Sequence, residues 1–459
     1  LGETIVQLSQ RPLSELAGWL EGLQAALSPQ AWEVAEPIVG DLRGRVRRLI
    51  DVGAGYLTLA RTSPTVSAGE AQRLRLASLL GSGLSGVLYV LDEPTIGLHP
   101  RDTARMIAVL KQLRDLGNTV LVVEHDLDVV RAADHVVDLG PGAGEQGGEV
   151  VVAGPPEAVA ACPASATGRY LSGRERIAVP SRRRGNGRRL VIRGARANNL
   201  KDITVALPLG MLVAVTGVSG SGKSTLLYDI LDRAARQRFY DAGDAPGDHE
   251  TIEGWEHLDK FITIDQTAIG RTPRSNAATY TDAFAAIRDT FAALPEARER
   301  GLQASHFSFN VPGGRCERCE GAGTLTVQMH LMPDVQVRCP ACHGRRFRRE
   351  VLAVRYRGHS ISGVLDMTIE EAAAAFQDVP AAAARLGLMV DVGLGYLRLG
   401  QPATSLSGGE AQRVKLAKEL ARRAGGHTLY LLDEPTTGLH PADVARLLGI
   451  LQRLVAAGN

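Results

Sequence analysis

Gly217-Val-Ser-Gly-Ser-Gly-Lys-Ser224 is the stretch that decides the fold of this 459-residue chain. It fits the pattern GxxxxGK[ST], with the apolar run LVAVTG (212–217) before it and the helix-like STLLYDIL (224–231) after it. A strand, a glycine-rich loop and a helix in this order indicate a phosphate-binding loop, because the loop turns backbone N–H groups towards phosphate oxygens. A plain glycine-rich turn would not need the lysine or these flanks. The sequence therefore predicts an α/β fold that binds a nucleotide.

Within this loop, Lys223 is expected to reach the β and γ phosphates of ATP, and Ser224 to coordinate Mg²⁺. The candidate nucleotide-binding residues of the loop are Gly217, Gly220, Gly222, Lys223, Ser224 and Thr225.

Other stretches of the chain occur twice. The pairs are DVGAGYLTL (51–59) with DVGLGYLRL (391–399), SAGEAQRLRLA (67–77) with SGGEAQRVKLA (407–417), and LDEPTIGLHP (91–100) with LDEPTTGLHP (432–441). Their offsets of 340, 340 and 341 residues are too long for a solenoid and indicate two copies of one large domain in tandem. Only the second copy contains the phosphate-binding loop, and only the first continues into GNTVLVVEHD (117–126). We therefore expect an internal fragment of a longer protein, with a natural truncation as the alternative.

Both LDEP stretches follow apolar strands and deliver two carboxylates to a strand end, where α/β folds bind ligands. Asp433 is expected to hold Mg²⁺ and Glu434 to orient or deprotonate the attacking water. Asp92 and Glu93 are their equivalents in the first copy. Acidic strand ends that cap the next helix would explain one copy, but two copies with the same flanks favour a nucleotide site.

SGGEAQ and SAGEAQ each start an amphipathic helix about 25 residues before LDEP. Each could be a simple helix cap, but with this placement they resemble the signature motif of ATP-binding-cassette (ABC) ATPases. In that family two cassettes pack head to tail, and each ATP lies between the phosphate loop of one and the signature of the other. The resemblance assigns ATP contacts to Ser67, Gly69, Ser407, Gly408 and Gly409. Ala68 replaces a signature glycine, so the two sites are expected to be unequal.

The same resemblance implies that Gln266 is the Q-loop residue and His125 the switch histidine. The D-loops are implied at 97–99 and 438–440. The site of Lys223 would be completed by Ser67 and Gly69 of the first copy. Because its switch histidine would lie beyond Asn459, the chain alone is expected to hydrolyse ATP poorly.

Four of the five cysteines form two CxxC pairs, Cys316/Cys319 and Cys339/Cys342, with 19 residues between them. This spacing predicts a closed tetrahedral Zn²⁺ site of structural type, in preference to a redox pair or free thiols. Arg345, Arg346, Arg348 and Arg349 flank Phe347 beside the last cysteine. This surface predicts contact with a nucleic-acid backbone, and a solvated basic face is the alternative.

Composition limits the remaining choices. Net charge is +2, from 52 basic and 50 acidic residues, which excludes a histone-like tail protein. No apolar run approaches the ~18 residues of a membrane span, and LGETIVQLSQ is not a targeting signal. The odd cysteine count argues against a secreted disulfide scaffold, so a cytoplasmic protein is expected.

The whole combination resembles the UvrA family, whose members recognise damage in bacterial nucleotide excision repair. The stretches that carry this are TGRYLSG (167–173), IGRTPRSN (269–276), ATYTDAF (278–284), HFSFNVPGGRCERCEG (306–321) and LGQPATSLSGGEAQRVKLAKEL (399–420). The resemblance implies tandem ABC cassettes with an inserted helical signature domain that carries the zinc module. It also implies ATP hydrolysis, binding of damaged double-stranded DNA as a homodimer, a UvrB-like partner and no nuclease activity. Arg271 and Arg274 join the candidate DNA contacts.

On this basis the first copy is divided into the helical part of a signature domain (1–66) and a cassette part (67–175). A basic linker (176–189) precedes the second cassette (190–280 and 403–459), which holds the inserted signature domain (281–402). One alternative function is that of a UvrA-like paralogue giving self-resistance to DNA-binding drugs. Another is a tandem-cassette ATPase acting on ribosomes, against which the four-cysteine insertion argues. A transporter subunit is a still weaker match, since no membrane segment is present.

Overall fold

The computed structural model describes residues 2–459 except 67, 82, 143, 145, 146, 181, 182, 184, 271, 330–334 and 423–425. The first copy contains α1 (Ile5–Gln10), α2 (Leu13–Ala26), α3 (Pro29–Asp51), α4 (Ala68–Leu80), β1 (Leu88–Asp92), α5 (Pro100–Asp115), β2 (Thr119–Val123), α6 (Leu127–Ala132), β3 (Val136–Gly140), β4 (Glu149–Gly154), α7 (Pro156–Ala161) and α8 (Ala166–Leu171).

The α/β elements of the second copy lie on both sides of a long helical insertion. Before the insertion lie β5 (Arg189–Ala195), β6 (Ile203–Pro208), the π-helical segment η3 (Thr225–Asp232), α9 (Arg233–Tyr240), β7 (Thr251–Glu253) and β8 (Lys260–Ile264). The insertion holds α10 (Ala277–Tyr280), α11 (Ala283–Ala293), α12 (Pro295–Glu299), β9 (Thr324–Val327), β10 (Val335–Arg338), α13 (Arg349–Ala353), α14 (Ile361–Asp366), α15 (Ile369–Ala375) and α16 (Pro380–Asp391). After it come α17 (Gly408–Ala421), β11 (Thr428–Leu432) and α18 (Pro441–Ala456).

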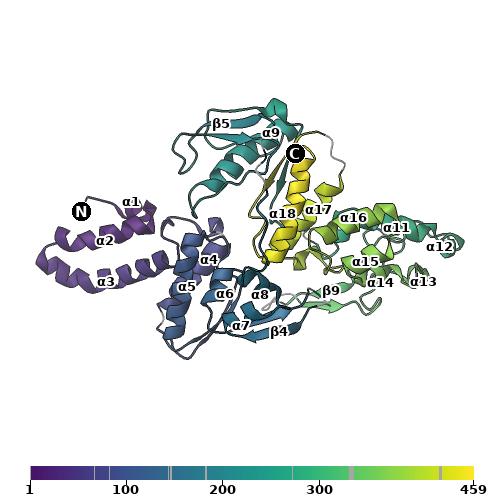
Figure 1. The fold of residues 1–459 in the computed structure, drawn as a ribbon, viewed down its shortest axis with the longest axis horizontal. Coiled ribbons are helices and arrows are strands. Elements are labelled where there is room, and N and C mark those ends of the chain that lie inside the picture. The colour runs from purple at the N-terminus through teal and green to yellow at the C-terminus, as the bar shows by residue number, and fades with distance from the viewer. Residues whose placement is uncertain are drawn as a thin grey trace.

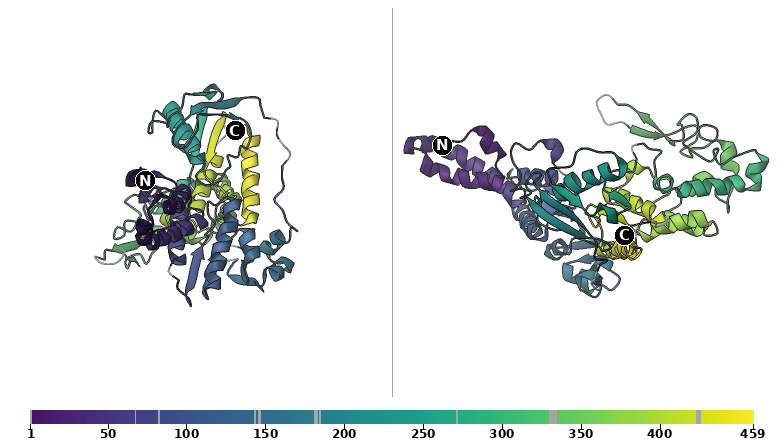
Figure 2. Two further views of the ribbon diagram at one scale, coloured as in Figure 1. Left: turned by 90° about the vertical axis from the view of Figure 1, so that its left-hand side faces the viewer. Right: turned by 90° about the horizontal axis from the view of Figure 1, so that it is seen from above.

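Each copy places its LDEP strand in a parallel pair. In the first copy β1 pairs with β2, and in the second β11 pairs with β8. The antiparallel sheet β6-β5-β7 belongs to the second copy, and β3 pairs with β4 in the first. In the figures α2 and α3 lie at one end of the molecule and the helical insertion at the other, with the parallel strands and α18 between them (Figures 1 and 2).

The apolar run 212–217 does not form the strand that the sequence predicts. Residues 212–217 are not part of a strand, and the side chains of Leu212 and Val213 are each 40% exposed. A strand requires a neighbour with which to share backbone hydrogen bonds. No strand in the described part of the chain pairs with this run.

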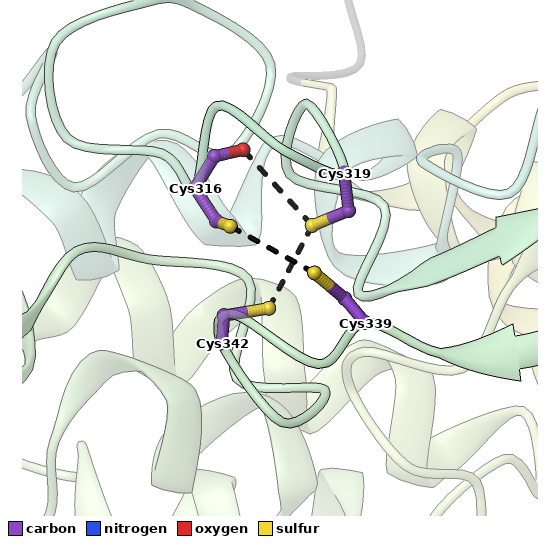
Figure 3. A group of neighbouring side chains, drawn as sticks. All are labelled: Cys316, Cys319, Cys339 and Cys342. Atoms are coloured by element: carbon purple, nitrogen blue, oxygen red, sulfur yellow. Dashed lines mark hydrogen bonds between the residues drawn. The ribbon is translucent and has the colours of Figure 1, made fainter.

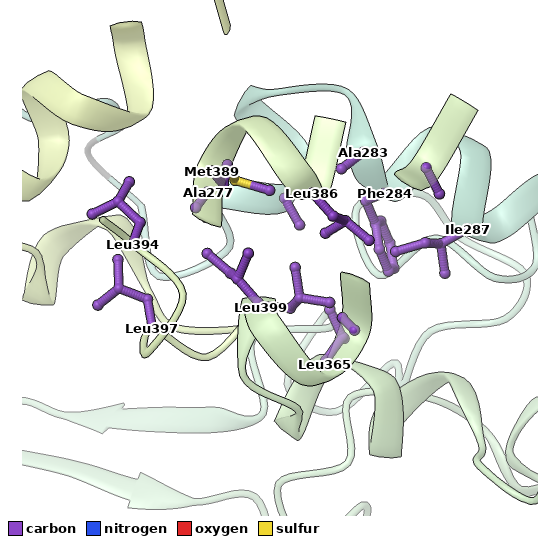
Figure 4. Packing of buried hydrophobic residues seen from close by; sticks show 14 of the residues in the cluster. Ala277, Ala283, Phe284, Ile287, Leu365, Leu386, Met389, Leu394, Leu397 and Leu399 are labelled. Carbon is purple, nitrogen blue, oxygen red and sulfur yellow. The ribbon is translucent and has the colours of Figure 1, made fainter. Parts of the chain in front are cut away.

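Among the described residues, the largest core cluster lies in the helical insertion and extends into α17 and α18; it is built around buried phenylalanines and aliphatic residues. Phe284 and Ile287 of α11 lie close to Leu386 of α16 and above Leu365 of α14 (Figure 4). This core also includes Leu416 of α17, so the signature helix is packed on the insertion. No helix among the described residues is long and apolar enough to cross a membrane.

Candidate functional site

The phosphate-binding loop has the backbone that its glycines predict. Gly217, Gly220 and Gly222 have φ angles of 150°, 77° and 97°, a region that residues with a Cβ rarely adopt. The Nζ of Lys223 donates to the carbonyls of Gly217 at 2.8 Å and Val218 at 3.0 Å. The loop therefore curls around its own lysine, directly before the helix that begins at Thr225.

The two LDEP glutamates share an unusual backbone. Glu93 has φ 42° and Glu434 has φ 39°, both left-handed, although neither is a glycine. Such strain persists where the surroundings fix a side chain in a required direction, and it is typical of functional sites. Burial raises the pKa of Glu93. Burial and the adjacent Glu434 carboxylate raise the pKa of Asp433.

The glutamine of each signature motif ties the signature helix to the LDEP strand end. The Nε2 of Gln412 donates to the carbonyls of Asp433 at 2.7 Å and Ile264 at 3.0 Å. In the first copy the Nε2 of Gln72 donates to the carbonyl of Asp92 at 2.8 Å. The amide thus links motifs that lie 20 or 21 residues apart in the sequence.

The repeated stretch DVGxGYL supports the signature helix through its tyrosine. The Tyr56 hydroxyl donates to Glu70 Oε1 at 2.5 Å, and the Tyr396 hydroxyl donates to Glu410 Oε1 at 2.6 Å. Burial and this carboxylate raise the pKa of Tyr56 to about 12. No role was predicted for these tyrosines, although their recurrence at the same offset as the signature motif was a usable signal in the sequence.

Signature residues of the second copy start α17. The backbone N–H of Ser407 donates to Glu410 Oε2 at 2.7 Å, and the Ser407 hydroxyl accepts from the Glu410 N–H at 3.2 Å, which forms a capping box. A Cβ at Gly408 would lie 3.2 Å from Gln266 Oε1, so the expected Q-loop residue lies beside its own copy's signature. Ser67 lies outside the described residues, and Gly69 lies in the first turn of α4.

The two copies meet across the phosphate-binding loop. The Ser219 hydroxyl donates to the carbonyl of Gly97 at 3.1 Å. A Cβ at Gly220 would lie 2.8 Å from the Tyr56 ring, and one at Gly97 would lie 3.7 Å from Glu434 Oε2. The phosphate-binding loop of the second copy therefore faces the stretch 91–99 of the first copy. It also faces Tyr56, which supports the first copy's signature helix.

The opposite side shows the reciprocal contact. A Cβ at Gly438 would lie 3.1 Å from Glu93 Oε2, and His125 Nε2 lies 3.7 Å from Glu93 Oε1. Glu124 positions this corner, because Oε2 accepts from the His125 N–H at 3.0 Å and Oε1 accepts from the Thr95 N–H at 3.0 Å. Glu124 precedes the predicted switch histidine directly in the sequence, and no role was predicted for it.

The four cysteines of the insertion gather in one buried cluster (Figure 3). The Sγ atoms of Cys316 and Cys339 lie 4.0 Å apart, and those of Cys319 and Cys342 lie 3.7 Å apart. A tetrahedron with Zn–S bonds of ~2.3 Å has S–S edges of about 3.8 Å, so the cluster fits zinc.

The arginines beside the cluster divide into exposed and internal ones. Arg345 and Arg349 are exposed, and Arg348 is exposed while pairing with Glu317 at 3.1 Å. Arg274 pairs with Glu320 at 3.7 Å. Arg271 lies outside the described residues.

Arg346 and Phe347 differ from the expectation of a basic surface with an interleaved aromatic residue. The Arg346 guanidinium donates to the Gly400 carbonyl at 2.9 Å and lies 5.3 Å from the Phe309 ring. Burial lowers the pKa of Arg346. Phe347 is 2% exposed and belongs to the core of the insertion. A short run of arginines around a phenylalanine does not reveal from sequence which of its side chains point inwards.

Known proteins with a similar sequence and structure identify the family of this arrangement. No protein-family model matches the chain. UvrABC system protein A of Thermus thermophilus is 58% identical over 459 residues, and that of Neisseria meningitidis serogroup A is 56% identical over 460. Each comparison covers the whole chain and 48% of the relative, so the chain spans about half the length of these proteins.

The crystal structure of UvrA2 from Deinococcus radiodurans superposes with a TM-score of 0.89 at 48% identity, over the whole chain and 56% of that protein. The expected fold is thereby confirmed: ABC-type α/β cassettes in tandem, with an inserted helical domain that carries a four-cysteine cluster. Along its whole length, the chain belongs to the UvrA family.

Proposed function

We propose that the protein is an ATP-dependent recognition subunit for damaged DNA in bacterial nucleotide excision repair. The observation that carries this proposal is the facing of the two copies, in which the loop of Lys223 lies against the Gly97 stretch and Tyr56 of the other copy. Such an arrangement supports ATP sites that are shared between cassettes. DNA binding could then be coupled to nucleotide state, because closing a shared site moves both copies.

In this proposal the phosphate-binding loop and Lys223 hold the phosphates of ATP. Mg²⁺, held by Ser224 and Asp433, would neutralise charge that develops on the phosphates. Glu434 orients the attacking water and accepts its proton, helped by the left-handed backbone that fixes its direction. Gly69 and the residues around it complete the site from the first copy.

The second site uses Asp92, Glu93 and His125 of the first copy. Ser407, Gly408 and Gly409 of the second copy complete it in the same head-to-tail manner. The Glu93–His125 pair is already close, at 3.7 Å, which supports a role for the histidine in orienting water or the γ-phosphate.

Zinc, in our proposal, has a structural role. Its four ligands would be the buried cysteines, and the antiparallel hairpin of β9 and β10 extends from them. Zinc bound by the four cysteines would order the surface that carries Arg345, Arg348 and Arg349. Together with Arg274 and Arg271, these side chains are the proposed contacts to DNA phosphates. Arg346 is omitted, because its guanidinium is bonded within the insertion.

We further propose that the protein acts in the cytoplasm as a homodimer, hands DNA to a UvrB-like partner and has no nuclease activity of its own. The domain limits given above, from 1–66 to 403–459, are part of this proposal. The alternative, a UvrA-like paralogue that gives self-resistance to DNA-binding drugs, has less support, because relatives at 56–58% identity carry the name UvrABC system protein A.

The test is binding of the whole protein to a damaged and an undamaged duplex at one stated salt concentration, with and without ATP. The proposal expects tighter binding to the damaged duplex and ATP turnover that DNA modulates. Equal affinity for both duplexes in all nucleotide states would refute the recognition function.

A further inference from the structure

The stretch TGRYLSG at 167–173 has no role in the function proposed above. Its threonine lies in the first turn of α8, and the Thr167 hydroxyl donates to Asp138 Oδ1 at 2.7 Å. The Ser165 hydroxyl donates to Asp138 Oδ2 at 2.6 Å. Asp138 of β3 thus receives both hydroxyls, which fixes the start of α8 and commits the Thr167 proton to the carboxylate.

A histidine of the other copy reaches this threonine. His440 Nε2 lies 3.3 Å from Thr167 Oγ1, and His440 Nδ1 accepts from the Ala442 N–H at 3.2 Å. An Nδ1 that accepts a hydrogen bond carries no proton, so the ring is neutral with its hydrogen on Nε2. Because Thr167 donates to Asp138, its oxygen is free to accept from His440. The Tyr170 ring packs edge-on against the imidazole at 5.9 Å.

The same histidine lies at the corner of Glu93. Its ring is edge-on to that of His125 at 6.4 Å, and His125 Nε2 is 3.7 Å from Glu93. Gly438, two residues before His440, approaches Glu93 so closely that a Cβ there would lie 3.1 Å from Oε2. The hydrogen bonds that join Asp138, Thr167 and His440 therefore anchor residues 438–440. This loop of the second copy lies beside Glu93 of the first copy. In the ribbon, α8 lies at the end of α18, the helix that follows His440 (Figure 1).

We propose that His440 is a positioning residue for the Glu93 site, anchored across the copies by Thr167 and Asp138. In this role the neutral imidazole holds residues 438–440 against Glu93, so that the first copy's glutamate is aligned only when the second copy is docked. The inference rests on the proposed ATPase function, and it gives the TGRYLSG stretch a task in that function. His99, the first copy's equivalent, makes the same Nδ1 bond, to Arg101 at 3.2 Å.

The charges around His440 support a neutral ring. Burial lowers the pKa of His440, and the nearby His125 and Arg169 lower it further. Two carboxylates raise it, namely Asp443 on its own helix and Asp138 on β3. A histidine with a depressed folded-state pKa favours the folded state above its unfolded pKa of ~6.5. As pH falls below ~6.5, the unfolded chain takes up a proton that the folded chain resists, and stability declines.

The experiment measures ATP turnover of the whole protein carrying Glu434→Gln, which silences the second copy's own glutamate, so that the remaining hydrolysis depends on Glu93. In that background His440→Gln and Thr167→Val are expected to lower kcat about tenfold, the effect of losing ~1.4 kcal/mol of alignment, with KM changed less than about twofold. Thr167→Ser, which keeps the hydroxyl, is expected to restore kcat. His135→Gln, an exposed histidine of the first copy, is the control for a histidine change as such.

A second readout does not depend on activity. The Tm of the parent is expected to fall between about pH 7 and pH 5.5, and His440→Gln is expected to reduce that fall. Unchanged kcat in both His440→Gln and Thr167→Val would overturn the inference, as would failure of Thr167→Ser to restore it. A Glu434→Gln parent without turnover would also overturn it, because the Glu93 site would then be inactive. Wild-type protein without any ATPase would instead refute the proposed function.

Discussion

Replacing Gln412 by leucine tests the link between the signature helix and the LDEP strand. The Gln412 side chain is 3% exposed and donates to two backbone carbonyls, those of Asp433 and Ile264. Leucine keeps the approximate volume but donates nothing. Each lost buried hydrogen bond costs about 1 kcal/mol, so the change should cost about 2 kcal/mol of unfolding free energy.

For a domain of about 150–250 residues, a loss of about 2 kcal/mol of unfolding free energy lowers Tm by roughly 4–8 °C. Gln72→Leu is the matched control in the first copy. Its amide makes one bond, to the carbonyl of Asp92, and that bond is exposed to solvent, so we expect a loss below about 1 kcal/mol. Scanning calorimetry of the two variants and the parent measures the difference. The reasoning would be refuted if Gln72→Leu lowered Tm as much as Gln412→Leu, or if neither changed it.

The remaining predictions concern the cysteine cluster and the arginines beside it. Metal analysis should find about one zinc per chain, and chelation should speed amide exchange in β9 and β10 while leaving β5 and β6 protected; a metal-free protein with a protected β9–β10 hairpin would contradict the zinc assignment. Replacing Arg345, Arg348 and Arg349 together by alanine should weaken DNA binding on every sequence and flatten the dependence of log K on log salt by about 0.9 for each phosphate that the variant no longer neutralises. An unchanged salt slope would place the DNA-binding surface elsewhere on the protein. Arg346→Ala, in contrast, should lower Tm, because its guanidinium is bonded to Gly400.

Much of the site was predictable because its chemistry is local in sequence. The phosphate-binding loop needs glycines at fixed positions, and the three positive φ angles at Gly217, Gly220 and Gly222 agree with that need. The two CxxC pairs likewise predict a cluster, because each pair puts two thiols on one turn. Both features depend on a few neighbouring residues, so a linear pattern is enough.

Features that depend on distant partners were not predictable in the same way. The run 212–217 has the composition of a strand, but a strand forms only beside another strand. Phe347 was expected on a basic surface and is buried, because the insertion folds its core around that ring. The bonds from Tyr56 to Glu70 and from His440 to Thr167 join segments whose proximity is set by packing.

The most direct test of the account is whether the ATP site of Lys223 depends on the other copy. In whole protein carrying Glu93→Gln, which silences the first copy's own glutamate, turnover is measured after Tyr56→Ala and, separately, after Tyr396→Ala. Tyr56 packs on Gly220 of the second copy's loop, so its loss should lower kcat at least about tenfold, while Tyr396→Ala, which loosens the second copy's own signature helix, should have a much smaller effect. Equal falls in both variants, or a larger fall for Tyr396→Ala, would contradict the claim that the two copies share their ATP sites.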